Sequence, residues 1–284
     1  MKPVPFDVVR PRDLADALTC LSEAGGDARV LAGGQSLLPL LNLRLVRPPL
    51  LVDINDVTGL GALRRDAGAL VAGAAVRQRS LELDPVIQAE FPLLADAAPL
   101  IGRVATRNRG TIAGSLAHAD PAAELPAVAV ASDAELTLVS LRGQRRVAAA
   151  GFFTGPNRTV LETDEIVTAV RFPRPPARAG QAWLEYGRRY GDLPLVGAAC
   201  TVTLTADGDL ASADVVFAGA GPRPWRTPEA GFGELPSVAA AACEPPDDAR
   251  TSAAHRRRLV FALARRGLEL ARQRAVLAGG RHAA

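Results

Sequence analysis

Residues 28–45, ARVLAGGQSLLPLLNLRL, constrain the fold of this chain more than any other stretch. Residues 29–32 have the pattern of a short buried strand, the Gly33-Gly34 pair allows a sharp turn, and the apolar density of residues 37–45 predicts a helix. A helix that begins directly after a glycine turn directs unpaired backbone N–H groups and a positive dipole end at one point. Ser36 is placed to cap this helix or to donate its hydroxyl to an anion. The stretch therefore predicts a phosphate site.

A second small-residue stretch, residues 110–115 (GTIAGS), follows later in the chain. We predict a turn in which Ala113, Gly114 and Ser115 let a ligand approach the backbone, while Thr111 and Ser115 supply hydroxyls. Either stretch alone is also typical of a strand-to-helix connection that binds nothing, and the first matches neither a P-loop nor GxGxxG. Two such turns in one domain predict a pyrophosphate held between two lobes.

Composition limits the other possibilities. The 284 residues have room for two domains or one large one, and 48% hydrophobic and 22% charged residues are typical of a soluble globular protein. The N-terminal residues show no apolar run behind a basic head, and no stretch approaches the roughly 18 apolar residues of a membrane span. We therefore predict a cytoplasmic protein without a membrane span.

The cysteines and the charge distribution bear on metals and nucleic acids. Cys20, Cys200 and Cys243 lie far apart without a CxxC or Cys/His cluster, which predicts buried reduced thiols and no metal or iron–sulfur centre built by this chain. Residues 250–284 contain nine arginines and one glutamate, so the remainder of the chain is mildly acidic. Because Phe261 is the only aromatic residue in that tail, we predict no nucleic-acid binding.

Periodicity predicts alternating helices and strands early in the chain and an antiparallel hairpin around Asp207-Gly208 late in it. This order favours an α/β domain followed by a small α+β domain. Residues 172–181, rich in Pro, Gly and Arg, are the predicted boundary, which gives domains 1–176, with lobes of about 1–60 and 61–176, and 177–284. The predicted helices cover residues 14–21, 37–45, 91–104, 127–131 and those after Ser252. The first is capped by Asp13 and stopped by Gly25-Gly26; the third has Leu94, Ala97, Ala98 and Ile101 on one face, and the last has Leu259, Leu263 and Leu270 on its inner face. The predicted strands cover 29–32, 50–54, 69–74, 136–141, 145–149, 198–205 and 214–218, and a turn is predicted at 80–83.

Three motifs, taken in order, resemble a known family. Residues 31–45 (LAGGQSLLPLLNLRL), 107–127 (RNRGTIAGSLAHADPAAELPA) and 162–173 (ETDEIVTAVRFP) are similar to the FAD-binding medium subunit of molybdenum hydroxylases, a family that includes the carbon monoxide dehydrogenase flavoprotein and the flavin domain of xanthine dehydrogenase. Residues 188–192 (RRYGD) and 255–271 resemble its C-terminal domain, so the resemblance runs from end to end. It implies an α+β fold: a two-lobed FAD-binding domain of the vanillyl-alcohol-oxidase/PCMH type, followed by a small domain of antiparallel sheet and helix.

The resemblance also implies which residues bind FAD. The two glycine stretches grip the pyrophosphate from two sides, Glu124 lies near the ribityl chain or flavin with Asp120 close by, and Ile166 packs on the isoalloxazine. For Glu124 and Asp120 the alternative is that both are acids at a helix N-terminus, stabilised by the dipole. The implied cofactor-binding residues are Leu31, Ala32, Gly33, Gly34, Gln35, Ser36, Leu37, Thr106, Gly110, Thr111, Ala113, Gly114, Ser115, Asp120, Glu124 and Ile166.

Two positions depart from the family pattern. Ala113 stands where the family usually has glycine in TIGG, which requires a negative φ at this residue. Leu193 follows Asp192 where many members have Tyr or Phe, and an aliphatic side chain excludes water without stacking on a flavin. His118, near the implied flavin site, is expected to be a positioning residue. No catalytic residue is expected, since the cofactor carries the electrons.

The function implied by the resemblance is electron transfer in a larger complex. The chain would join a small [2Fe-2S] subunit and a large molybdopterin subunit, as a dimer of heterotrimers, and pass electrons from the iron–sulfur clusters through FAD to an external acceptor. One alternative is a free-standing FAD-dependent NAD(P)H reductase that resembles the enolpyruvyl reductase of cell-wall synthesis, although its active-site acid and serine are missing here. Another is a non-catalytic scaffold whose C-terminal helix binds a partner or nucleic acid through Arg256, Arg257, Arg258, Arg265 and Arg266, against the simpler reading of a solvated helix face.

Overall fold

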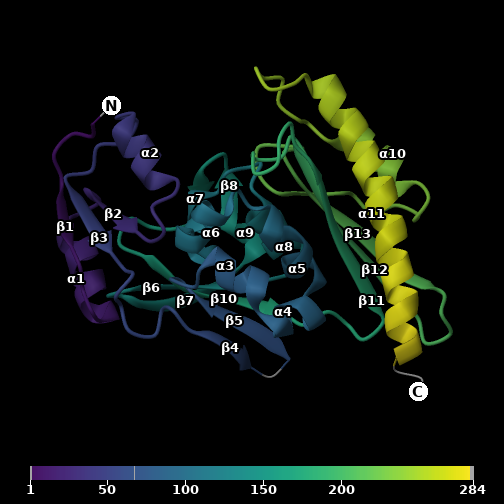
Figure 1. The fold of residues 1–284 in the computed structure, drawn as a ribbon, viewed down its shortest axis with the longest axis horizontal. Coiled ribbons are helices and arrows are strands. Elements are labelled where there is room, and N and C mark those ends of the chain that lie inside the picture. Colours follow the sequence, from purple (N-terminus) through teal and green to yellow (C-terminus); the bar gives the residue numbers. More distant parts are fainter. Residues whose placement is uncertain (1, 67, 282–284) are drawn as a thin grey trace.

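The computed structural model describes residues 2–66 and 68–281. Three β-sheets follow one another along the longest axis of the molecule, with the N-terminal sheet at one end and the C-terminal sheet and its long helix at the other (Figure 1). The sheet order along this axis follows the order of the sequence, because every strand of the middle sheet lies between β3 and β11 in the chain. Among the described residues, no helix combines the length and apolar character needed to cross a membrane.

The first sheet contains three parallel strands in the order β1-β3-β2. The side chain of Asp13 caps α1 by accepting the backbone N–H of Asp16 at 2.8 Å, and positive φ angles at Gly25 and Gly26 follow the helix end, as predicted. The predicted helix 37–45 is too long, because Arg44 has a left-handed φ of 58° that ends the run. The elements of this lobe are β1 (Asp7–Val9), α1 (Leu14–Glu23), β2 (Ala28–Leu31), α2 (Leu37–Asn42) and β3 (Leu50–Asp53).

The second sheet contains five antiparallel strands in the order β4-β5-β10-β6-β7. Its strands are β4 (Leu63–Asp66), β5 (Ala69–Gly73), β6 (Glu135–Ser140), β7 (Gly143–Ala148) and β10 (Ile166–Pro173). Between β5 and β6 lies a run of short helices: α3 (Gln78–Leu83), α4 (Pro85–Glu90), α5 (Pro92–Ala97), the 3₁₀ turn η1 (Ala98–Leu100), α6 (Val104–Arg109), α7 (Ile112–His118) and α8 (Glu124–Ala131). After β7 come α9 (Ala149–Phe152) and a small pair of strands, β8 (Phe153–Gly155) and β9 (Arg158–Thr159).

Two predictions in this helical run are wrong. Residues 80–83 are not a turn but lie within α3. The predicted helix 91–104 is divided, because Pro99 lies in η1 and Gly102 adopts a φ of 50° before α6 begins. Its four predicted inward residues, Leu94, Ala97, Ala98 and Ile101, are nevertheless all buried. The apolar pattern identified the buried face correctly but did not reveal where the chain turns.

The third sheet contains four antiparallel strands in the order β11-β12-β13-β14. The predicted hairpin is confirmed, since Gly208 has a φ of 91° between β12 and β13. The chain passes from the second to the third sheet within the predicted boundary segment, while the division at residue 176 into two domains stays a prediction. The elements are β11 (Ala179–Tyr186), β12 (Val196–Leu204), β13 (Leu210–Ala218), β14 (Trp225–Arg226), α10 (Leu235–Ala242) and α11 (Ala253–Arg281).

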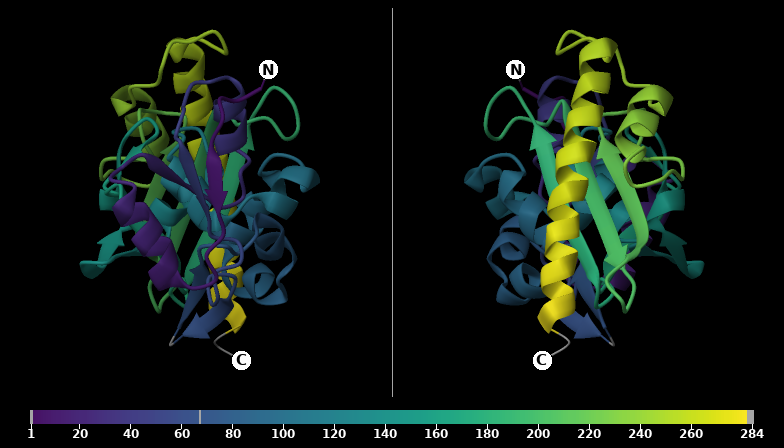
Figure 2. Two further views of the ribbon diagram at one scale, coloured as in Figure 1. Left: turned by 90° about the vertical axis from the view of Figure 1, so that its left-hand side faces the viewer. Right: turned by 90° about the vertical axis from the view of Figure 1, so that its right-hand side faces the viewer.

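Helices cover both faces of this sheet. α11 runs across the outer face, whereas α5 and α8 lie against the inner face (Figures 1 and 2). Consecutive residues of β13 alternate between two cores, because Val215 and Phe217 pack with the α11 side and Val216 and Ala218 with the α5/α8 side. Of the three predicted inward leucines of α11, Leu263 is buried, while Leu259 and Leu270 are half-buried against the same core.

The contact between β11 and α11 depends on the absence of a side chain at Gly180. A Cβ there would overlap the carbonyl oxygen of Ala271 and the amide nitrogen of Ala275, and would lie 2.9 Å from the Cα of Ala275. Because all three atoms belong to backbone, they cannot move aside as a side chain would. β11 and α11 therefore approach each other more closely here than any larger residue permits.

We expect Gly180→Ala to lower the free energy of unfolding by about 1 to 3 kcal/mol, because the added methyl forces helix and strand apart. Chemical denaturation of the purified chain measures this change. Gly151→Ala is the matched control, since the Cβ at this exposed helical position meets nothing within 4 Å and alanine favours a helix. Equal stability of the two variants would contradict the close-packing argument.

Candidate functional site

The two glycine stretches singled out in the sequence touch each other. A Cβ on Gly33 would overlap the carbonyl oxygen of Arg109 and lie 2.6 Å from the Cα of Gly110. A Cβ on Gly114 would lie 3.6 Å from that of Ala32. The turn before α2 and the junction between α6 and α7 are therefore in van der Waals contact, although they belong to different parts of the chain.

Several backbone amides are free at this contact. Within the described residues, the N–H groups of Gln35, Ser36 and Leu37 before and at the start of α2, and of Thr111 and Ala113 at the start of α7, donate to no acceptor. Free amides at helix starts carry partial positive charge and are the usual protein ligands of phosphate. The contact thus brings two sets of anion-binding donors together.

The local structure of both stretches differs from the prediction. Only Gly110 and Thr111 precede α7, so Ala113, Gly114 and Ser115 lie in a helix and not in a turn. The N-terminus of α7 is capped by Thr111, whose hydroxyl oxygen accepts the Gly114 N–H at 3.1 Å. Ser36 makes no capping hydrogen bond, so of its two predicted roles only donation to a ligand is open to it.

The residue that departs from the family's glycine, Ala113, has the backbone that it requires. It lies in the first turn of α7 and is not among the described residues with positive φ. Alanine is therefore accommodated without backbone strain at this position.

A polar link joins the two stretches, and its residues were not predicted. Asn55 donates its Nδ2–H to the Ala32 carbonyl at 2.8 Å and accepts a hydrogen bond from Arg77 Nη2 at 2.7 Å. Arg77 Nη1 in turn donates to the Arg109 carbonyl at 2.6 Å. Burial lowers the pKa of Arg77, with the positive charge of Arg109 adding to the effect, although the guanidinium stays protonated at any physiological pH. No local sequence pattern joins residues so far apart, so only the tertiary structure reveals this link.

Thr106, another predicted cofactor-binding residue, lies on α6, which is anchored by a buried ion pair. Arg107 is almost fully buried, and its Nε and Nη2 lie 2.8 and 3.3 Å from the two carboxylate oxygens of Glu82 on α3. Its Nη1 donates to the carbonyls of Ile101 and Gly102 at 3.0 and 3.1 Å. The hydrogen bond from Arg107 holds the pKa of Glu82 below its ordinary value. Thr106 itself is half-buried, and its methyl side lies against Gly102.

Glu124 is the buried acid of the site. It begins α8, is 2% exposed, and its Oε1 has no hydrogen-bond partner within the described residues. Burial raises its pKa to about 8, and the carboxylates of Glu185 and Asp120 add to the effect. At neutral pH it is therefore mainly a neutral acid that can donate as well as accept a hydrogen bond.

Asp120 and His118 lie just before Glu124, around a strained turn. Ala119 ends α7 with a left-handed φ of 52°, and its carbonyl accepts the Asn157 N–H at 2.9 Å. The Asp120 carboxylate accepts the Ala122 N–H at 2.9 Å, so this side chain stabilises the local turn. The His118 carbonyl accepts Asn157 Nδ2 at 3.0 Å, so this histidine is held through its backbone.

Two further predicted positions are set in different surroundings. Ile166 is buried at the start of β10, the strand against which α7 packs. Leu193 is 41% exposed on a loop whose Gly191 lies close to the carbonyl of Gly102, just before α6. Arg250 donates to the carbonyls of Leu193 and Pro194. The exposed Leu193 side chain thus lies on a braced loop near α6.

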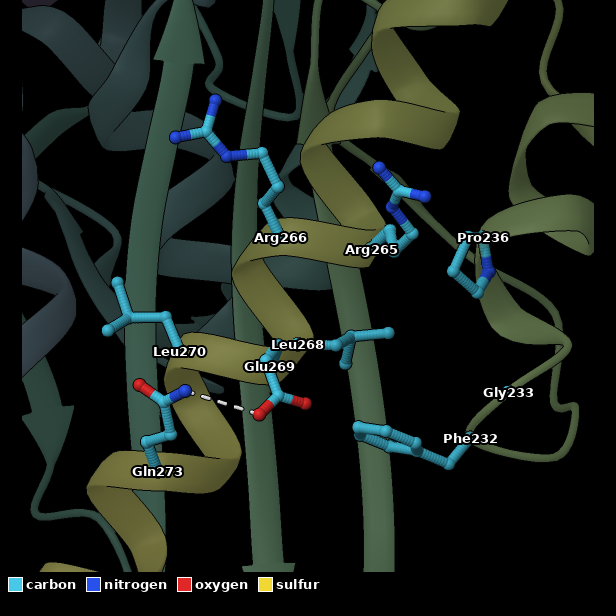
Figure 3. A pocket seen from close by; sticks show the side chains of 9 residues that line it. All are labelled: Phe232, Gly233, Pro236, Arg265, Arg266, Leu268, Glu269, Leu270 and Gln273. Carbon is cyan, nitrogen blue, oxygen red and sulfur yellow. Dashed lines mark hydrogen bonds between the residues drawn. The ribbon is translucent and has the colours of Figure 1, made fainter.

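One of the five arginines that the scaffold alternative assigned to partner or nucleic-acid binding is not accessible on the C-terminal helix. Arg256 is 2% exposed, and its Nη2 is paired with Asp248 at 2.8 Å while Nη1 donates to the Leu195 carbonyl. This arginine is therefore a structural residue and not a phosphate ligand. A pocket of about 430 Å³ lies between α11 and the segment before α10, where Arg265 and Phe232 face the same hollow (Figure 3). None of the predicted cofactor-binding residues lines it.

The cysteines are free thiols. Cys200 and Cys243 are buried, as predicted, whereas Cys20 is only half-buried. In residues 2–66 and 68–281, no three His, Cys, Asp or Glu side chains are grouped so as to hold a metal ion.

Comparison with known proteins places the chain in a family. Residues 4–175 match the family described as the FAD binding domain in molybdopterin dehydrogenase. The chain belongs to the FAD-binding medium subunits of molybdenum hydroxylases. Its mixed α+β fold, a PCMH-type FAD-binding domain with a C-terminal antiparallel sheet and helix, confirms the predicted fold class.

Individual members of this family are similar over most of their length. The 6-hydroxypseudooxynicotine dehydrogenase complex subunit alpha of Paenarthrobacter nicotinovorans is 42% identical over 81% of this chain and 78% of its own. The carbon monoxide dehydrogenase medium chain of Hydrogenophaga pseudoflava is 34% identical over 95% of this chain and 98% of its own, and the structure of that organism's enzyme matches with a TM-score of 0.91 over 96% and 99%. Quinoline 2-oxidoreductase from Pseudomonas putida 86 matches with a TM-score of 0.91 and 33% identity, over 97% and 99% of the two chains.

The residues present at the contact fit the cofactor of the family. FAD carries a diphosphate, which suits two adjacent sets of free amides, and its ribityl hydroxyls suit a buried acid with an unpartnered oxygen. The glycine at position 33 leaves room for the two stretches to meet.

The pKa of Glu124 predicts a pH-dependent stability. Because the folded-state pKa is raised from 4.5 to about 8, the folded chain binds more protons than the unfolded chain between these values, and stability falls as pH rises through this window. Glu124→Gln removes the titration. We expect its free energy of unfolding relative to wild type to rise between pH 5 and pH 9, by at most about 5 kcal/mol.

Denaturant unfolding at several pH values measures this difference. Asp16→Asn on α1, an exposed carboxylate, provides a control without a buried acid. Parallel pH profiles for wild type and Glu124→Gln would show that Glu124 ionises normally.

Proposed function

We propose that this chain is the FAD-carrying electron-transfer subunit of a molybdenum hydroxylase complex. The observation that carries the proposal is the contact between the starts of α2 and α7, with free amides on both sides. When bound, FAD accepts two electrons and releases them to an acceptor. The polypeptide binds and orients the cofactor and controls the charge around it.

In this proposal the diphosphate lies between the two helix starts. The amides of Gln35, Ser36 and Leu37 bind it from one side, and those of Thr111 and Ala113 from the other. The hydroxyl of Ser36 adds a donor, since it caps no helix. The remaining members of the proposed cofactor-binding set are Leu31, Ala32, Gly33, Gly34, Thr106, Gly110, Gly114, Ser115, Asp120, Glu124 and Ile166.

Glu124 has a distinct role in the proposal. As a neutral acid it binds a ribityl or ring oxygen without placing a negative charge next to a flavin that takes up electrons. At the position of the exposed Leu193, many family members have an aromatic side chain that can cover the flavin. The aliphatic side chain here cannot stack on the flavin, and in this proposal it leaves a path by which the electron acceptor reaches it.

The partners follow from the relatives. They are named as subunits or medium chains of dehydrogenases, which implies large and small subunits beside a chain of this kind. We propose that a small [2Fe-2S] subunit delivers electrons to this chain, that a large molybdopterin subunit oxidises the substrate, and that the assembly is a dimer of heterotrimers. The free buried thiols suit a reducing, cytoplasmic location.

Cofactor binding tests the site. We expect the complex, or the chain with added FAD, to contain flavin, and Gly33→Ala to weaken FAD binding by about ten-fold or more, because the methyl separates the two helix starts. Flavin absorbance after gel filtration and fluorescence titration measure this. Gly61→Ala is the control, since its Cβ meets nothing within 4 Å. A wild-type preparation that neither contains FAD nor takes it up would refute the proposal.

Electron delivery separates the proposal from the reductase alternative. We expect the flavin of the assembled complex to bleach on addition of the oxidisable substrate, and the same chain without its iron–sulfur partner to stay oxidised, because electrons arrive through that partner. Anaerobic absorbance spectra at the flavin band record both results. Rapid NAD(P)H oxidation by the isolated chain would instead favour a free-standing reductase.

A further inference from the structure

We propose that Arg77 and Asn55 form a positioning strap that fixes the two diphosphate-binding stretches relative to each other. The inference rests on the proposed function, because it assigns a purpose to residues that reach the FAD loops from behind. Both residues are half-buried, and neither is among the residues expected to touch the cofactor.

The strap is a continuous chain of hydrogen bonds. From the first stretch it runs from the Ala32 carbonyl to Asn55 Nδ2 (2.8 Å), and from Asn55 Oδ1 to Arg77 Nη2 (2.7 Å). Arg77 Nη1 then donates to the Arg109 carbonyl (2.6 Å), which directly precedes the second stretch. Asp53 keeps the Asn55 amide in this orientation by accepting both its Nδ2–H and its backbone N–H, the latter at 3.1 Å.

The strap also orients the peptide planes. In a trans peptide the carbonyl and the following N–H point in opposite directions. By holding the Ala32 carbonyl, Asn55 turns the Gly33 N–H away from itself, and this N–H has no acceptor in the part of the chain that the structure describes. The Gln78 N–H holds the Gly110 carbonyl at 2.9 Å and turns the free Thr111 N–H away from α3 in the same manner.

Arginine suits this position for two physical reasons. Its planar fork reaches two oxygens, Asn55 Oδ1 and the Arg109 carbonyl, from one rigid group. Its charge lies at the C-terminal end of α6, where a cation is stabilised by the helix dipole. A lysine can supply the charge but not the fixed pair of donors.

The strap is distinct from the anchor that holds α6 in the core. The ion pair of Arg107 with Glu82 and the bonds from Arg107 to two carbonyls place α6 without any contribution from Arg77. Loss of Arg77 is therefore expected to free the first stretch from the second while the core stays folded. This separates a positioning role from a purely structural one.

The test compares FAD affinity and local mobility in Arg77→Met, Asn55→Ala and the double variant. We expect each single change to weaken FAD binding by about ten-fold, and the double variant to be within about twofold of Arg77→Met, because both changes break one link. Arg77→Lys is expected to remain weaker than wild type. Arg79→Met is the matched control, since Arg79 lies two residues further on in α3, is also half-buried, and pairs with Glu82 rather than with the loops.

Hydrogen exchange of the FAD-free chain provides a readout that does not depend on the cofactor. We expect Arg77→Met to accelerate exchange of the Leu38 amide, which donates to the Gly34 carbonyl at 3.0 Å, and of the Ile112 amide, which donates to the Val76 carbonyl at 3.1 Å, and to leave α11 unchanged. Unchanged exchange in both stretches, acceleration throughout the chain, or FAD affinity within twofold of wild type would overturn the strap. If the wild-type chain binds no FAD, the proposed function fails, and the exchange pattern alone decides whether the strap exists.

Discussion

The close approach of Gly33 to the Arg109-Gly110 backbone is the contact on which the rest of the site depends. Any side chain at position 33 would occupy the space of that backbone, so the two stretches meet only because one of them lacks a Cβ. The contact brings the starts of α2 and α7 together, and with them the free amides that neither helix uses. Two weak anion-binding ends thereby become one site that suits a diphosphate.

Different polar contacts hold the two sides of this site. The buried pair of Arg107 and Glu82 fixes α6 to α3 within the helical layer, where removing Glu82 would leave the buried charge of Arg107 without its carboxylate. The hydrogen bonds of Asn55 and Arg77 instead join the Ala32 carbonyl, just after β2, to the Arg109 carbonyl, just before the second stretch. The first contact maintains the core and the second sets the spacing of the two stretches, so stability and ligand geometry are controlled by separate residues.

The third sheet joins the cofactor region to the C-terminal helix. Because α5 and α8 cover one face and α11 the other, its central strands bury both faces, and Gly180 on β11 permits the close approach of α11. The carboxylate of Glu185, near the end of β11, adds to the raised pKa of Glu124 at the start of α8 across this interface. The burial that packs the sheet against α8 is therefore also what keeps Glu124 protonated at neutral pH.

From the sequence alone, the resemblance of three motifs to a known family indicated the family and the cofactor. The order of most elements followed from glycine pairs, helix caps and the hairpin turn, which act over a few residues. Asp13, Gly25-Gly26 and Asp207-Gly208 ended or began elements where predicted, whereas β1, β4, β10 and β11 were missed. The pairing partners of β1 and β10 lie far away in the chain, and β4, with the sequence LRRD, lacks an apolar alternation. Likewise Ala113 and Gly114 were assigned to a turn because small residues there do not reveal that Thr111 caps a helix. Only the tertiary structure decided that the two glycine stretches touch, that Arg107 points into the core, and that Asn55 and Arg77 bridge the gap. Contacts between residues distant in sequence depend on how the sheets pack, and no local pattern encodes that packing.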